Sequence, residues 1–99
     1  MNITVIGCGR WGTFIAWYLD SIGHNVKLYG KSDAPQMQEL LQTRKNNLIS
    51  LSDSMTLTTS LDDALSDAET IIVSIGSQAL RGLLGEIKPY EIKNQTFVL

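Results

Sequence analysis

The stretch VIGCGRWGTFIA, residues 5–16, contains three glycines, Gly7, Gly9 and Gly12, in the spacing G-x-G-x-x-G. The preceding segment, residues 2–6, is rich in β-branched residues, which predicts a strand buried on both faces of a parallel sheet. Glycines so close together leave one short piece of backbone without side chains. Such a backbone allows a sharp turn and the close approach of another group to the main chain.

A helix is predicted directly after the glycines, because apolar residues recur at helical spacing over residues 11–22. Gly23 follows, where a left-handed helix cap forms. Residues 25–29 favour a second strand, so these segments form a β-α-β unit of about thirty residues. In this setting the glycine spacing indicates a dinucleotide-binding turn.

Each motif glycine has a separate physical role in this interpretation. Gly7 permits the tight turn after the strand, Gly9 lets a phosphate approach the main chain, and Gly12 lets the helix pack closely on the strand. The free amides and the positive dipole end of the helix then face a pyrophosphate. The predicted ligand is therefore a small-molecule dinucleotide cofactor, and a purely structural glycine turn is the alternative.

The remaining chain continues to alternate between helices and strands. Pro35 is predicted at the first position of a second helix, and Ser60 is predicted to form a capping box with Asp63. Ser77 is predicted to cap a last helix that Pro89 ends. Further strands are predicted over residues 55–59, 70–74 and 96–99.

This α/β pattern predicts a Rossmann-like, doubly wound parallel sheet. Residues 1–99 are interpreted as one NAD(P)-binding domain. The sequence ends within the apolar strand that includes Phe97, Val98 and Leu99, and a free carboxylate there would end a buried strand. We therefore expect the domain to be cut short at its C-terminus.

The charge balance excludes several classes of partner. Eight basic and ten acidic residues give a net charge of -2, so no general field attracts nucleic acid or an anionic membrane.

Cys8 is the only cysteine, which excludes an internal disulfide and favours a cytoplasmic location. No apolar run approaches the ~20 residues of a membrane span. Met1 and Asn2 lead directly into the first predicted strand without a basic segment or cleavage site, so export is not expected.

The end of the second predicted strand bears on the choice of cofactor. NAD-binding domains place an acidic residue there to hold the ribose 2'-hydroxyl. Here Tyr29 is followed by Gly30, Lys31 and Ser32, and Asp33 comes too late for the usual carboxylate contact. A cation and a hydroxyl favour NADPH over NADH, and the alternative is that Lys31 is an ordinary solvated lysine.

The sequence predicts no catalytic or metal-binding residue. His24, the lone histidine, precedes the second strand at the edge opposite its carboxyl end, so it is interpreted as a loop residue. Cys8 is interpreted as a small packing residue rather than a reactive thiol. The acidic residues around the predicted third helix indicate a solvated face rather than a metal site: Asp62, Asp63, Asp67 and Glu69.

The segment GCGRWGT, residues 7–13, resembles the G-x-G-x-W-G-T/S turn of NAD(P)-dependent glycerol-3-phosphate dehydrogenases. Three further stretches are similar to that family: HNVKLYGK at 24–31, LTTSLDDALSDAETIIVSI at 57–75 and SQALR at 77–81. The chain departs from the family at Arg10, where serine is common, and at Gly76, where proline is common. Residues 45–55 lack the tyrosine and proline that the family shows in this loop.

The resemblance implies that the full-length enzyme transfers hydride between NAD(P)H and dihydroxyacetone phosphate, giving sn-glycerol 3-phosphate for phospholipid synthesis. It makes Arg10, Trp11, Lys31 and Ser32 cofactor contacts, with the three motif glycines beneath the pyrophosphate. The catalytic lysines and the substrate domain of the family would follow Leu99, so residues 1–99 alone should bind cofactor without turnover. A homodimer is a further expectation.

Two other functions fit the same glycine turn. One is a non-catalytic, nucleotide-sensing regulatory module, against which Trp11 and the SQALR stretch argue. The other is the cofactor domain of another two-domain NAD(P)-dependent reductase, because a shared fold does not fix a substrate.

Overall fold

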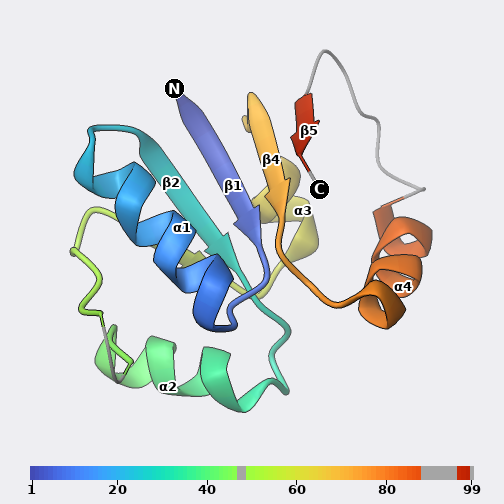
Figure 1. Cartoon of the computed structure of the whole chain (residues 1–99), viewed down its shortest axis with the longest axis horizontal. Coiled ribbons are helices and arrows are strands. Elements are labelled where there is room, and N and C mark those ends of the chain that lie inside the picture. The colour runs from blue at the N-terminus through green and yellow to red at the C-terminus, as the bar shows by residue number, and fades with distance from the viewer. Residues whose placement is uncertain (47–48, 88–95, 99) are drawn as a thin grey trace.

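The computed structural model describes residues 1–46, 49–87 and 96–98, and for residues 77, 78, 87 and 96–98 it describes the backbone alone. Helices and strands alternate along the chain (Figure 1). In chain order they are β1 (Asn2–Ile6), α1 (Arg10–Ser21), β2 (Asn25–Tyr29), α2 (Pro35–Thr43), β3 (Thr56–Thr58), α3 (Leu61–Leu65), β4 (Thr70–Val73), α4 (Ser77–Ile87) and β5 (Thr96–Val98).

The described strands form one sheet in the order β3-β2-β1-β4-β5, and every neighbouring pair is parallel. The chain first builds outward from β1 through β2 to β3 and then returns to add β4 and β5 on the other side. The direction of building therefore reverses between β1 and β4, and the carboxyl ends of these two strands meet there (Figure 1). The prediction of a Rossmann-like, doubly wound sheet is confirmed.

Two apolar clusters cover the two faces of the sheet, because successive side chains of a strand point to opposite faces. Val5 and Leu28 belong to the cluster that α1 and α2 cover, with Ala16 from α1 and Met37 from α2. Ile6 and its neighbours on the other face pack against α3 and α4. A central strand covered on both sides explains why β1 is apolar along most of its length.

Helix ends follow several of the predicted signals. Gly23, just after α1, has a φ of 104°, the left-handed conformation expected of a glycine cap. Pro35 is the first residue of α2, as predicted. Ser60 Oγ accepts a hydrogen bond from the Asp63 N–H at 3.3 Å, which is the first half of the predicted capping box.

The prediction for the second half of that capping box, in which the Asp63 carboxylate accepts a backbone N–H at the start of α3, is wrong. The Ser60 N–H donates to Thr58 Oγ1 at 3.1 Å, and the Asp63 carboxylate lies 3.5 Å from Lys27 Nζ. The cap of α4 also differs, because Ser77 is already helical and the Gly76 carbonyl accepts the Leu80 N–H at 3.0 Å.

Two predictions near the C-terminus fall outside the described residues. They are the end of the last helix at Pro89 and the inclusion of Leu99 in the last strand. Within the part of the chain that the structure describes, no helix has the length and apolar character needed to cross a bilayer.

Candidate functional site

The turn between β1 and α1 depends on glycine at two points. Gly7 has a φ of 121°, and a Cβ on it would lie 2.1 Å from the Ser74 carbonyl oxygen. A Cβ on Gly12 would lie 1.9 Å from the Gly7 carbonyl oxygen. Neither space admits a side chain, so both glycines let backbone pack directly on backbone where β1, β4 and α1 meet.

Gly9 differs from the other two because it faces open space. It caps α1 in an extended conformation, with φ -71° and ψ -172°, and an added Cβ would meet no atom within 4 Å. The N–H groups in the first turn of a helix have no acceptor within the helix. No side chain caps α1 and its first turn holds no acidic residue, so these N–H groups and the helix dipole form a ready site for an anion.

Thr13 fixes the shape of this turn, a role that the sequence analysis missed. The side chain is buried, and its hydroxyl donates to the Cys8 carbonyl at 3.0 Å. The Thr13 N–H donates to the Gly9 carbonyl at 3.0 Å. These two bonds engage the Cys8 and Gly9 carbonyls, while the Gly7 N–H donates to the Tyr29 carbonyl of β2 at 2.9 Å.

Cys8 packs beneath the turn. A Cβ on Gly30 would lie 2.6 Å from Cys8 Sγ and 2.8 Å from Met37 Sδ, so Gly30 is small to make room for this sulfur. Burial raises the pKa of the Cys8 thiol, and a backbone hydrogen bond opposes that shift without cancelling it. Burial and a raised thiol pKa support the interpretation of Cys8 as a packing residue.

Arg10 and Trp11 stand at the exposed start of α1. The Trp11 side chain is 72% exposed, and its ring meets the Phe14 ring edge to face, with 6.3 Å between ring centroids. Both residues line a shallow apolar hollow together with Phe14, Asn46 and Ile49. The sequence-predicted contacts thus border the anion site without being packed into the protein.

Lys31 borders a second hollow, a mostly apolar cavity of about 200 Å³ at the carboxyl ends of β1 and β2. Gly7, Tyr29 and Gly30 form part of its wall, and Leu83 of α4 closes one side. Ser32 is exposed, and its carbonyl accepts a hydrogen bond from Gln38 Nε2 at 3.2 Å. The cavity therefore joins the glycine turn to the segment after β2, and the cofactor contact of Lys31 stays a prediction.

Asp33 also borders this cavity. The Ala34 N–H donates to the Lys31 carbonyl at 3.0 Å, which closes a turn that includes Asp33. That Asp33 comes too late for the usual carboxylate contact with a ribose hydroxyl stays a prediction. An unforeseen partner also appears, because Lys31 Nζ lies 3.6 Å from Glu86 Oε1 of α4.

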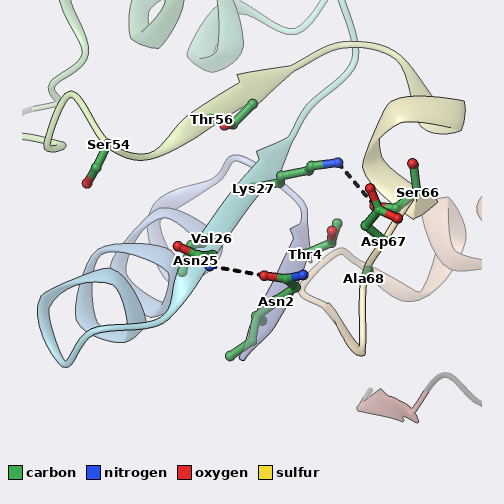
Figure 2. Close-up of a pocket in the computed structure, with 11 residues that line it drawn as sticks. Asn2, Thr4, Asn25, Val26, Lys27, Ser54, Thr56, Ser66, Asp67 and Ala68 are labelled. Carbon is green, nitrogen blue, oxygen red and sulfur yellow. Dashed lines mark hydrogen bonds between the residues drawn. The ribbon is translucent and has the colours of Figure 1, made fainter.

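A larger hollow, of about 290 Å³, lies at the opposite edge, where the amino ends of β1 and β2 meet (Figure 2). Hydrogen bonds join several of the polar groups that line it. Asn25 Nδ2 donates to Asn2 Oδ1 at 3.1 Å, and Lys27 Nζ donates to the Ser66 carbonyl at 3.1 Å (Figure 2). Ligands of such sheets bind at the carboxyl ends of the strands, so we assign no ligand to this hollow.

His24 lies at this same amino edge, directly before β2. This position agrees with its interpretation as a loop residue. In the described ranges no three histidine, cysteine, aspartate or glutamate side chains are grouped so that they would hold a metal ion.

The glycine turn, its open anion site and the adjoining cavity can now be compared with known proteins. The model of the family described as NAD-dependent glycerol-3-phosphate dehydrogenase N-terminus matches residues 2–99. The chain belongs to this family. The motif of three glycines, with tryptophan before the last of them, lies within the matched residues.

Relatives match this chain over nearly its whole length. The glycerol-3-phosphate dehydrogenase (NAD(P)+) of Thermoanaerobacter sp. (strain X514) is 30% identical over 102 residues, which cover 100% of this chain and 30% of the relative. The enzyme of the same name from Herminiimonas arsenicoxydans is 37% identical over 101 residues, or 95% of this chain and 30% of the relative. The chain thus spans about 30% of the length of these family members.

A solved structure agrees with the fold. The crystal structure of glycerol-3-phosphate dehydrogenase from Coxiella burnetii superposes with a TM-score of 0.85 at 20% identity, covering 97% of this chain and 30% of that one. At this identity the likeness establishes the fold, and the family assignment rests on the sequence match.

Proposed function

We propose that this chain is the cofactor-binding domain of an sn-glycerol-3-phosphate dehydrogenase and that it binds NADP or NAD. The observation that carries the proposal is the open amino end of α1 at Gly9, which offers N–H groups and space to a pyrophosphate. The family membership supports the same ligand. A regulatory module or another reductase would use a similar turn, but neither alternative is favoured by the family match.

The proposed contacts follow the geometry of the turn. The pyrophosphate lies over Gly9, while Gly7 and Gly12 hold β1 and α1 close enough to form its site. Arg10 and Trp11 cover the ligand from the exposed start of the helix. Lys31 and Ser32 face the adenosine ribose at the cavity beyond β2.

The proposed reaction of the full-length enzyme is hydride transfer between NAD(P)H and dihydroxyacetone phosphate, in glycerophospholipid synthesis. The nicotinamide supplies the hydride, and residues of this chain bind and orient the cofactor. We assign no catalytic residue within residues 1–99. A cytoplasmic homodimer is part of the proposal for the full-length enzyme.

Calorimetric titration of the 99-residue chain with NADH and NADPH tests this function. The expected result is saturable binding of at least one cofactor, without oxidation of NADPH when dihydroxyacetone phosphate is added. A correctly folded chain that binds neither cofactor would contradict the proposal.

Trp11→Ala is expected to lower the affinity for either cofactor about five- to tenfold, because a stacked aromatic ring contributes about 1 kcal/mol to a contact. The exposed ring contacts the Phe14 ring edge to face, so the free energy of unfolding should change by no more than about 1 kcal/mol. Tyr18→Ala is the matched control, because Tyr18 is 52% exposed further along the same helix. Equal affinities for the wild-type and Trp11→Ala proteins would remove Trp11 from the site.

Lys31→Ala is expected to weaken NADPH binding while NADH binding changes little, because only NADPH carries a 2'-phosphate for the ammonium group. The wild-type chain is expected to bind NADPH more tightly than NADH, and the substitution should narrow that difference. NADH serves as the internal control in the same titration. Unchanged affinities for both cofactors would show that Lys31 is a solvated lysine.

A further inference from the structure

The ion pair between Lys31 and Glu86 spans the space beside the cavity at the carboxyl ends of β1 and β2. Lys31 follows β2, and Glu86 lies near the end of α4, so the pair joins two elements that are distant in the sequence. The Nζ–Oε1 distance is 3.6 Å, and the two side chains are 63% and 45% exposed. Both groups therefore remain accessible to solvent and to a ligand.

The Lys31 ammonium already has an acidic partner. Glu86 Oε1 of α4 lies 3.6 Å from Lys31 Nζ, and Asp33 borders the same cavity as Lys31. The pair with Glu86 neutralises part of the charge that Lys31 offers to a ligand. A phosphate monoester carries a charge of about -1.5 to -2 near pH 7, so it would meet a cation that is already partly neutralised.

An exposed ion pair is weak, typically worth about 1 kcal/mol or less. Glu86 can therefore be displaced from Lys31 by a doubly charged phosphate, but the displaced carboxylate stays close and repels that phosphate. A cofactor with a 2'-hydroxyl requires no such displacement. The ion pair therefore lowers the affinity for a cofactor with a 2'-phosphate more than the affinity for a cofactor with a 2'-hydroxyl.

We infer that Glu86 is a specificity-determining residue. By competing for Lys31, it lowers the preference of this chain for a dinucleotide that carries a 2'-phosphate. The inference rests on the proposed cofactor-binding function. Glu86 acts on the ligand through Lys31 and through direct charge repulsion, and it takes no part in binding the pyrophosphate. The preference of the wild-type chain for NADPH is accordingly small, although Lys31 is present.

The test is calorimetric titration of the wild-type chain and of Glu86→Gln with NADPH and NADH. Glu86→Gln keeps the size of the side chain and removes its charge. The expected result is NADPH binding about three- to tenfold tighter than in the wild type, with NADH affinity changed less than about twofold. The gain should shrink at high salt, because exposed charges are screened.

Two further variants separate this effect from a general change of charge or fold. In a Lys31→Ala background, Glu86→Gln should improve NADPH binding by clearly less than it does alone, because the competition for Lys31 is gone. Glu69→Gln removes the same charge at the opposite edge of the sheet, where Glu69 Oε1 accepts the Asn2 N–H at 3.1 Å. That control should leave both affinities unchanged.

Glu86→Gln that leaves NADPH affinity unchanged, or that changes NADPH and NADH affinity equally, overturns the inference while the proposed function stands. A folded wild-type chain that binds neither cofactor overturns both. If Glu86→Gln raises NADPH affinity equally in the wild-type and Lys31→Ala proteins, Glu86 does not compete for Lys31. Glu86 would then act only as a distant source of charge, and the inference is also overturned.

Discussion

Replacing Gly12 with alanine is expected to destabilise this domain by about 3 kcal/mol or more, because the new Cβ would lie 1.9 Å from the Gly7 carbonyl oxygen. That oxygen belongs to the backbone at the end of β1, so relief of the clash requires α1 to move away from the sheet. For a domain of this size the midpoint of thermal unfolding should fall by roughly 12–24 °C. Circular dichroism during heating measures the change.

Gly82→Ala is the matched control for Gly12→Ala. Gly82 lies in the exposed part of α4, and a Cβ there would meet no atom within 4 Å. Alanine at a helical position is more favourable than glycine by about 0.5–1 kcal/mol, so this variant should be as stable as the wild type or more so. A Gly12→Ala protein with unchanged thermal stability would contradict the close packing of α1 on the turn.

Gly9→Val is expected to abolish most cofactor binding and to leave the fold intact. The φ and ψ of Gly9 suit any residue, and the space before it is open, so valine fits the free protein. Its methyl groups would occupy the space where the pyrophosphate must approach the N–H groups of α1. Loss of about two hydrogen bonds to a charged phosphate predicts an affinity at least about 100-fold weaker, measured by calorimetry.

The free energy of unfolding of Gly9→Val should stay within about 1 kcal/mol of the wild-type value, the scale of a changed helix cap. Gly9→Val and Gly12→Ala therefore separate two functions of one motif, since one loses the ligand and the other loses the fold. A Gly9→Val protein that binds NADPH as tightly as the wild type would contradict the placement of the pyrophosphate at Gly9.

Much of this fold could be predicted from sequence because its signals are local. The β-branched residues before Gly7 indicated a buried strand, and β1 is the central strand of the sheet. The position of Pro35 gave the start of α2. These features depend on the conformational preferences of neighbouring residues, which the sequence displays directly.

The parts that sequence missed depend on contacts between distant segments or on the fine geometry of a turn. Glu86 reaches Lys31 because α4 and the segment after β2 border one cavity, which no local pattern reveals. The Asp63 carboxylate was assigned to a helix cap because its tertiary partner, Lys27, lies on β2, distant in the sequence.

In the proposed complex, main-chain N–H groups at the start of α1 hold the pyrophosphate. Amide nitrogen–proton correlation spectra, recorded while NADPH is added to the labelled chain, observe these groups directly. The largest shifts are expected for the amides of residues 9–12, with amides at the amino edge of the sheet unchanged. Saturable binding that leaves the amides of residues 9–12 unshifted would contradict this placement of the pyrophosphate.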